Sequence, residues 1–396
     1  MTGTWLQITG RAFLVYQVTG SKKALGVIYF VSYIPNLLLA PFAGVIADRF
    51  DRRRQLVLTQ ALLAAGAVAM GVLAHTGTAT LLNVGGISLA MGIVQVAAGP
   101  VSQAVMPSLV PTEDLSSAIT LSSASQSATR VFGPLLAGLL IPAVGVAWAF
   151  YGSGIAASLL VVVWARTPLP PVEAASGEGP LAAIRSGLRF ARRTPRIRHP
   201  LVIVTFMSAV GLVYQPLTVA LATDVLADGD SSRGAGYYGI LQAGVGVGSV
   251  IGILAFSGMG GRRPGRALLA SSAGFGVVLA LLGLSSSTVT VVAAMVGIGA
   301  FHFASATLAL DVLQHSTTEA FRGRIMSLYS MAWVGLFPFT SIIGGFLADS
   351  VGLRATLSGA GVLCTLFALS YVRWCAPTLA ALAAGEVAAD PVDDRR

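Results

Sequence analysis

Twelve long apolar blocks run through this sequence of 396 residues. A helix needs about 20 mostly apolar residues to cross a lipid bilayer. Only 10% of the residues are charged, against roughly 25% in a soluble domain, which is too few to cover a water-soluble surface. The sequence therefore predicts an all-α membrane protein with twelve transmembrane helices. The blocks are 3–19, 24–47, 55–75, 79–106, 116–141, 144–166, 200–224, 235–257, 265–284, 287–312, 323–347 and 353–375.

The blocks divide the chain into two halves of six. Residues 1–166 and 200–375 are the halves, 167–199 are a linker, and 376–396 are a tail. The halves repeat weakly, since a shift of 207 residues places Gly138 on Gly345 and a shift of 213 places Gly26 on Gly239. Two parallel six-helix repeats with a binding site at the middle of the membrane are a transporter architecture.

The basic residues indicate an orientation. If the loop after the second block is cytoplasmic, 19 Lys and Arg residues lie on the cytoplasmic side and 4 on the other. We therefore expect both termini and the linker in the cytoplasm of a bacterial cell, with the chain in the inner membrane. The arginines and apolar residues of 181–193 separate onto two faces, which predicts an interfacial helix on an anionic leaflet. The net charge of +9 then reports topology, and no nucleic-acid partner is expected.

Residues 44–54 (GVIADRFDRRR) carry the strongest motif. They resemble the G-x-x-x-D-R-x-G-R-R loop of the major facilitator superfamily, with Asp51 in place of the second glycine. The resemblance implies the superfamily fold of two six-helix halves and a conformational latch that forms in one access state. The alternative is an ordinary positive-inside loop. The latch residues would be Gly44, Asp48, Arg49, Asp51, Arg52 and Arg53.

Two further segments resemble parts of the same superfamily. Residues 130–138 (RVFGPLLAG) resemble an exporter motif in the fifth helix, with Ala137 replacing one glycine. That motif would comprise Arg130, Gly133, Pro134 and Gly138, although a plain packing kink is the alternative. Residues 321–329 and 344–349 resemble the drug:proton antiporter-3-like branch, which includes enterobactin exporters and macrolide efflux proteins. Export of amphipathic small molecules is what this resemblance implies.

The first block is short for a membrane span. It has at most 17 residues and contains the polar residues Gln7, Thr9 and Arg11. Members of this branch begin with a basic segment and a further half-helix. We therefore expect the first helix to be truncated in this sequence.

The resemblance also implies a substrate cavity between the halves. Arg130 is the most specific candidate, because a cation inside the membrane costs several kcal/mol unless it is paired or faces water. It would contact a substrate or bond helix carbonyls beside Pro134. Gln7 and Arg11 are candidates on the first helix. The other cavity candidates are Tyr33, Asn36, Gln95, Gln126, Tyr214, Gln215, His302 and Trp333.

Proton coupling needs a group that can titrate in the pathway, yet no carboxylate lies at mid-depth in the sequence. His302 could shuttle protons or be structural. Asp311 and Asp224 lie near helix ends and are the remaining candidates.

Other chemistries find little support. The only lysines are Lys22 and Lys23, so there is no phosphate-binding loop, and the four histidines lack metal-ligand spacing. We expect no enzyme activity, no cofactor and no metal. The sequence predicts a monomeric, proton-coupled secondary exporter whose partners are a small-molecule substrate, protons and the lipid bilayer. The alternatives are an importer or uniporter of the same fold, or a membrane sensor that transports nothing.

Overall fold

The computed structural model describes residues 2–49, 51–105, 109–169, 180–260 and 264–383. In these residues every regular element is a helix or a helical turn, and no strand occurs. The helices of the first half are α1 (Thr2–Thr19), α2 (Lys22–Arg49), α3 (Arg52–Thr76), α4 (Leu81–Val105), α5 (Leu115–Val144) and α6 (Val146–Arg166), with a short turn η2 (Thr112–Asp114) before α5. The linker holds α7 (Pro180–Arg193).

The second half has more, shorter elements. They are α8 (Pro195–Phe206), η3 (Met207–Gly211), α9 (Tyr214–Ala220), η4 (Leu221–Leu226), α10 (Ser231–Gly260), α11 (Pro264–Leu284), α12 (Thr288–His315), α13 (Glu319–Val334), α14 (Phe337–Ser350) and α15 (Leu353–Ala383). Helices therefore occupy all twelve predicted block positions.

Within the described residues, nine helical stretches are long and apolar enough to cross a membrane, and Val131–Val144 of α5 is a shorter apolar stretch. Large apolar side chains are also exposed on the outside of the bundle, such as Leu82 at 86% and Val289 at 78%. A surface of this kind requires an apolar solvent. The prediction of an all-α membrane protein is confirmed.

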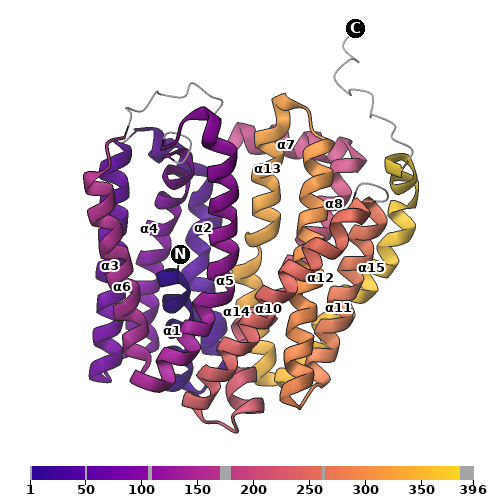
Figure 1. Cartoon of the computed structure of the whole chain (residues 1–396). Coiled ribbons are helices and arrows are strands. Elements are labelled where there is room, and N and C mark those ends of the chain that lie inside the picture. The colour runs from indigo at the N-terminus through magenta and orange to yellow at the C-terminus, as the bar shows by residue number, and fades with distance from the viewer. Residues whose placement is uncertain (1, 50, 106–108, 170–179, 261–263, 384–396) are drawn as a thin grey trace.

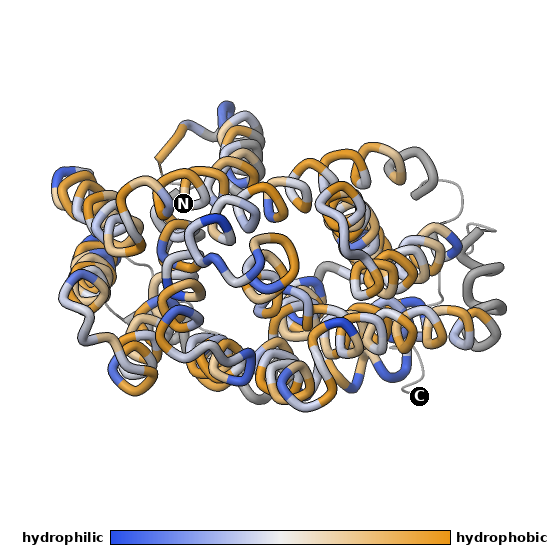
Figure 2. Tube along the Cα trace, turned by 90° about the horizontal axis from the view of Figure 1, so that it is seen from below, coloured by the Kyte–Doolittle hydropathy of each residue, from blue (hydrophilic) through white to orange (hydrophobic). Residues whose placement is uncertain are grey.

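The two halves lie side by side, with the linker helix α7 at one end of the bundle (Figure 1). This end also carries Arg52, Arg53 and Arg54, and we call it the arginine-rich end. The halves pack on each other mainly through α2 against α14 and α5 against α10. Seen along the helices, hydrophobic residues predominate in both halves (Figure 2).

Two predicted helices are broken in the structure. Blocks 200–224 and 323–347 were each expected to be one continuous helix, but the first contains wide turns and the second stops between Val334 and Phe337. Pro216 has no N–H to donate to the preceding turn, and Gly335 and Pro338 flank the second break.

The two breaks satisfy each other's backbone. The hydroxyl of Ser208 donates to the carbonyl of Trp333 at 2.7 Å. The hydroxyl of Thr340 donates to the carbonyls of Ser208 and Ala209 at 3.1 and 2.8 Å. Irregular backbone is tolerated at membrane depth where such partners exist. Hydropathy does not detect these hydrogen bonds, which is why continuous helices were predicted.

The predicted linker helix is present as α7 and packs on the second half. The rings of Phe190 and Phe321 stack at 4.3 Å, and Ala191 is buried with Ile197 and Ile325. Part of the apolar face is therefore covered by protein, while Leu188 and Arg189 are exposed. An interfacial position on lipid stays a prediction.

Candidate functional site

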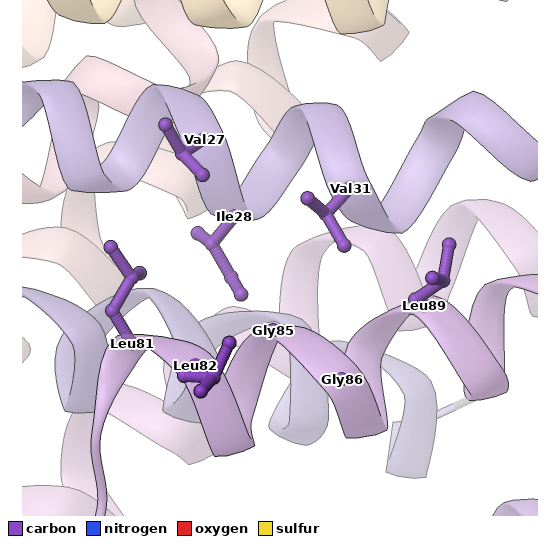
Figure 3. A pocket seen from close by; sticks show the side chains of 8 residues that line it. All are labelled: Val27, Ile28, Val31, Leu81, Leu82, Gly85, Gly86 and Leu89. Atoms are coloured by element: carbon purple, nitrogen blue, oxygen red, sulfur yellow. The ribbon is translucent and has the colours of Figure 1, made fainter.

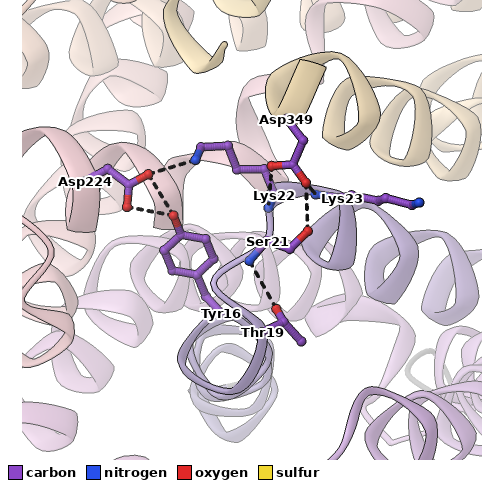
Figure 4. Close-up of polar contacts among 7 residues, drawn as sticks. All are labelled: Tyr16, Thr19, Ser21, Lys22, Lys23, Asp224 and Asp349. Atoms are coloured by element: carbon purple, nitrogen blue, oxygen red, sulfur yellow. Dashed lines mark hydrogen bonds and ion pairs between the residues drawn. The ribbon is translucent and has the colours of Figure 1, made fainter. Parts of the chain in front are cut away.

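A network centred on Asp224 joins the two halves at the end opposite the arginine-rich end. Lys22 at the start of α2 lies 3.0 Å from the Asp224 carboxylate in η4. The Tyr16 hydroxyl of α1 donates to the two carboxylate oxygens at 2.6 and 2.7 Å (Figure 4). One acid of the second half thus binds two elements of the first.

Asp349 of α14 makes a second cross-half contact beside the first. It accepts from the Ser21 hydroxyl at 2.7 Å and from the backbone N–H groups of Lys22 and Lys23 at 3.1 and 3.0 Å (Figure 4). A carboxylate at a helix N-terminus satisfies free N–H donors and complements the helix dipole. Asp349 therefore caps α2 from the opposite half.

Glycine contacts bring the helices of the two halves together next to this network. A Cβ built on Gly138 of α5 would lie 2.8 Å from the Cα of Gly239 of α10. A Cβ built on Gly345 of α14 would lie 3.0 Å from the Cα of Gly26 of α2. The first value is shorter than real Cβ atoms show, and the same Cβ on Gly345 would also lie 2.6 Å from the carbonyl of Lys22, so these backbone approaches require glycine. We call these the two glycine contacts.

The predicted exporter motif lies in this packing. Gly133 faces the Trp5 side chain of α1, where a Cβ would come within 2.6 Å. The carbonyl of Pro134 would lie 3.0 Å from a Cβ on Gly239. The side chain of Arg130 lies outside the described residues. The described part of the motif is thus a helix-packing surface.

The contacts of Asp224 and Asp349 with Tyr16, Ser21, Lys22 and Lys23 form what we call the closing network. A polar layer lies deeper in the bundle than this network. It combines Arg11 of α1 with Tyr29 and Tyr33 of α2, and with Tyr238 and Gln242 of α10. Arg11 is 6% exposed and lies within electrostatic reach of Tyr29 and Tyr33. Gln242 donates to the Tyr238 hydroxyl at 3.3 Å. The layer therefore contains groups from both halves.

His302 of α12 lies in an aromatic cluster inside the second half. It is 3% exposed, stacks on Trp333 at 4.6 Å and lies 5.0 Å from the Phe275 ring. Tyr214 is buried and lies edge-on to Phe275. Three predicted cavity residues are thus close together, while Tyr33 belongs to the polar layer.

Among the described residues, the remaining cavity candidates form no hydrogen bond with these groups. Asn36, Gln95 and Gln126 are exposed, and Gln215 is half-buried. Gln126 reaches Ser122 one turn earlier in its own helix at 3.4 Å. Asp311, a predicted coupling residue, pairs with His315 of the same helix at 3.2 Å near the arginine-rich end.

The predicted latch is described only in part, because the side chains of Gly44, Asp48 and Arg49 lie outside the described residues. Asp51 is the N-cap of α3 and accepts from the backbone N–H of Arg54 at 2.8 Å. The Arg53 guanidinium donates to the carbonyl of Ala165 at the end of α6. Arg52 is half-exposed. These described groups act within the first half.

An apolar groove opens on the outer face of the first half between α2 and α4 (Figure 3). Its volume is about 530 Å³. No Cβ built on Gly85 or Gly86 would meet another atom within 4 Å. The lining offers no polar side chain for substrate recognition. It consists of Val27, Ile28, Val31, Leu81, Leu82, Gly85, Gly86 and Leu89.

A family model described as transmembrane secretion effector matches residues 1–392. The chain belongs to the transmembrane secretion effector family. It is 28% identical over 327 residues to the enterobactin exporter EntS of Shigella boydii serotype 18, which covers 81% of this chain and 76% of that protein. Enterobactin exporter EntS of Escherichia coli O9:H4 is 27% identical over the same shares.

Two solved structures share the fold of this chain. Nucleoside transporter NupG matches with a TM-score of 0.71 and 12% identity, covering 94% of this chain and 98% of that one. A bacterial homologue of the human lysosomal transporter Spinster, inward-facing and unoccupied, matches with a TM-score of 0.69 and 15% identity, covering 96% of each. The family match and the exporter relatives identify the chain as a multi-pass membrane transporter of the major facilitator superfamily and not an enzyme.

Sequence reasoning missed most of the closing network of this transporter. Asp224 was predicted as a coupling candidate, but Tyr16, Lys22 and Asp349 were not predicted as site residues. One signal was available, since the chain's only two lysines lie on the same predicted side of the membrane as Asp224 and Asp349. Charge complementarity across the two halves could have suggested the pairing.

Proposed function

We propose that this transporter exports small amphipathic molecules, of the siderophore or drug class, from the bacterial cytoplasm in exchange for protons. Alternating access of two halves around a central site is the mechanism. The similarity to enterobactin exporters supports the direction and the substrate class.

The position of the closing network carries this proposal. The ion pair of Lys22 with Asp224, the bonds of Asp349 and the two glycine contacts all lie at the end opposite the arginine-rich end. The positive-inside rule places that end outside the cytoplasm. In our proposal the structure is the state that faces the cytoplasm, ready to receive a molecule for export, with both termini on the cytoplasmic side.

Asp224 is the coupling acid in this proposal. Of the three coupling candidates, Asp224 joins the two halves, whereas His302 lies among aromatic rings and Asp311 pairs within its own helix. A proton on Asp224 would cancel its attraction to Lys22 and remove an acceptor for Tyr16. Protonation from outside would then favour opening on that side.

Transport in everted membrane vesicles tests the proposal. With an acid-inside pH gradient, a panel of drugs and siderophores is offered from the medium, and at least one compound should accumulate inside. A protonophore should abolish the accumulation. Accumulation that needs no gradient would indicate a uniporter, and loss of preloaded compound to the medium would indicate an importer. Either result would overturn proton-driven export.

A further inference from the structure

Arg11 is a buried cation in the body of α1. The residue is 6% exposed, and it lies eight residues before the end of α1 at Thr19, a rise of about 12 Å. A guanidinium stays protonated in proteins. Its charge must therefore be met by other groups, because an isolated cation at membrane depth costs several kcal/mol.

No carboxylate in the described part of the chain lies at the depth of Arg11. The acidic residues that the structure describes fall at helix ends or in the turns between helices. In the part of the chain that the structure describes, Arg11 takes part in none of the ion pairs, which include those of Lys22 with Asp224 and of His315 with Asp311. No described acid therefore neutralises Arg11.

Two phenol side chains lie within electrostatic reach of this cation. They are Tyr29 and Tyr33, whose rings stack at 6.2 Å with an angle of 3° between them. Phe337 of the second half lies edge-on to both rings, at 5.8 and 5.0 Å. Tyrosine hydroxyls donate hydrogen bonds, and their rings offer flat apolar walls.

The second half contributes polar atoms to the same layer. Tyr238 contacts the Phe13 ring of α1 edge-on at 5.5 Å and receives a hydrogen bond from Gln242. The side-chain oxygen of Gln242 is buried and has no hydrogen-bond partner in the structure. A buried acceptor without a donor is costly, and a bound molecule could supply that donor.

We propose that Arg11 binds an anionic group of the transported molecule, a carboxylate or phenolate attached to an aromatic ring. The guanidinium presents a planar fork of donors that matches a carboxylate, and the tyrosines supply hydroxyl donors and stacking surfaces. This inference rests on the proposed export function in one respect, because it takes the bound molecule to be the transported substrate. It adds that the favoured substrates are organic anions.

Binding to the purified full-length chain tests this assignment without any need for transport. The probes are anthracene-9-carboxylate and anthracene-9-carboxamide, which share a ring system and differ in charge, titrated by fluorescence. The wild type should bind the carboxylate at least tenfold more tightly than the carboxamide. Arg11→Gln should weaken carboxylate binding at least tenfold and leave carboxamide binding unchanged. Arg354→Gln, at an exposed arginine near the start of α15, is the matched control and should bind both probes like the wild type.

Two milder variants keep the test decisive if Arg11→Gln does not fold. Arg11→Lys retains the positive charge but lacks the planar guanidinium with its paired N–H donors. Tyr33→Phe removes only a hydroxyl. Each should weaken carboxylate binding about threefold and spare the carboxamide. Equal binding of the two probes by the wild type would overturn the assignment, as would unchanged carboxylate binding in these Arg11 and Tyr33 variants. Carboxylate binding that depends on Arg11, combined with no transport in vesicles, would instead contradict the export function alone.

Discussion

At the residue scale, the two acids of the closing network hold the halves together by different physical means. Asp224 binds side chains, a lysine and a phenol, whereas Asp349 binds mainly backbone N–H groups at the start of α2. Every amino acid except proline offers the same backbone N–H donor. The Asp349 contact therefore depends on where α2 begins, and the Asp224 contact depends on the identity of Tyr16 and Lys22.

Asp224→Asn should weaken closure on the side opposite the arginine-rich end. Hydrogen bonds to charged groups contribute about 1.5–3 kcal/mol, but the Asp224 side chain is 34% exposed. After solvent screening we expect about 1 kcal/mol, a roughly fivefold shift between access states. Proton-driven transport should fall, and a cysteine reporter at Thr19 should label faster with an impermeant maleimide. Asp311→Asn is the control, and equal effects of both variants would contradict the closing role.

Asp51 illustrates how a departure from a family motif can keep a local function. The Asp51 carboxylate caps α3 where the superfamily loop has glycine. Asp51→Ala should lower the free energy of unfolding by about 1 kcal/mol, measured by thermal unfolding in detergent. Asp51→Asn can still accept the bond from Arg54 and should stay near the wild type. Equal losses in the two variants would show that charge and not capping matters there.

At the element scale, the halves meet where glycine removes side chains from two helix pairs. The contact between α5 and α10 and the contact between α2 and α14 leave no room for a Cβ. Packing of this kind stabilises helix association through close backbone approach. It also makes closure sensitive to a single added side chain.

Gly345→Val should prevent the halves from closing. Its Cβ would lie 2.6 Å from the carbonyl of Lys22 and 3.0 Å from the Cα of Gly26, both backbone atoms that cannot rotate away. We expect transport to fall at least tenfold while the protein still inserts into the membrane. Gly85→Val is the matched control, because its Cβ meets no atom within 4 Å. Full transport activity in Gly345→Val would refute this account of the contact.

The broken helices give a second prediction at this scale. Thr340→Val removes the hydroxyl that serves the carbonyls of Ser208 and Ala209. Buried carbonyls without donors cost about 1–3 kcal/mol, so the apparent melting temperature should drop by several degrees. Thr205→Val removes a hydroxyl that bonds only within its own helix and should be nearly neutral.

At the scale of the whole molecule, sequence patterns predicted the twelve helices, the two halves and the linker helix. Hydropathy and repeat spacing carry that information because lipid contact acts on whole helices. The closing network was beyond such patterns, since Tyr16 and Asp224 are 208 residues apart and Ser21 and Asp349 are 328 apart. The polar layer was predicted only in part: Arg11 and Tyr33 were named, but Tyr29 and Tyr238 look like ordinary apolar-block residues.

Cross-linking the halves tests alternating access directly. The Ser21 hydroxyl lies 2.7 Å from an oxygen of Asp349, so Ser21→Cys with Asp349→Cys should form a disulfide under mild oxidation. The oxidised double variant should not transport, and a reductant should restore transport to the level of the untreated double variant. Each single variant controls for loss of the native contact. Transport that persists in the cross-linked protein would mean that this end never opens.

The two glycine contacts have a consequence for how the halves are related. Gly138 corresponds to Gly345 and Gly26 to Gly239 in the internal repeat, while the contacts join Gly138 with Gly239 and Gly26 with Gly345. Each contact is thus the other with its partners exchanged, which is the isologous pattern of a twofold dimer. A single six-helix half therefore carries both complementary surfaces of its own interface and could pair with a copy of itself.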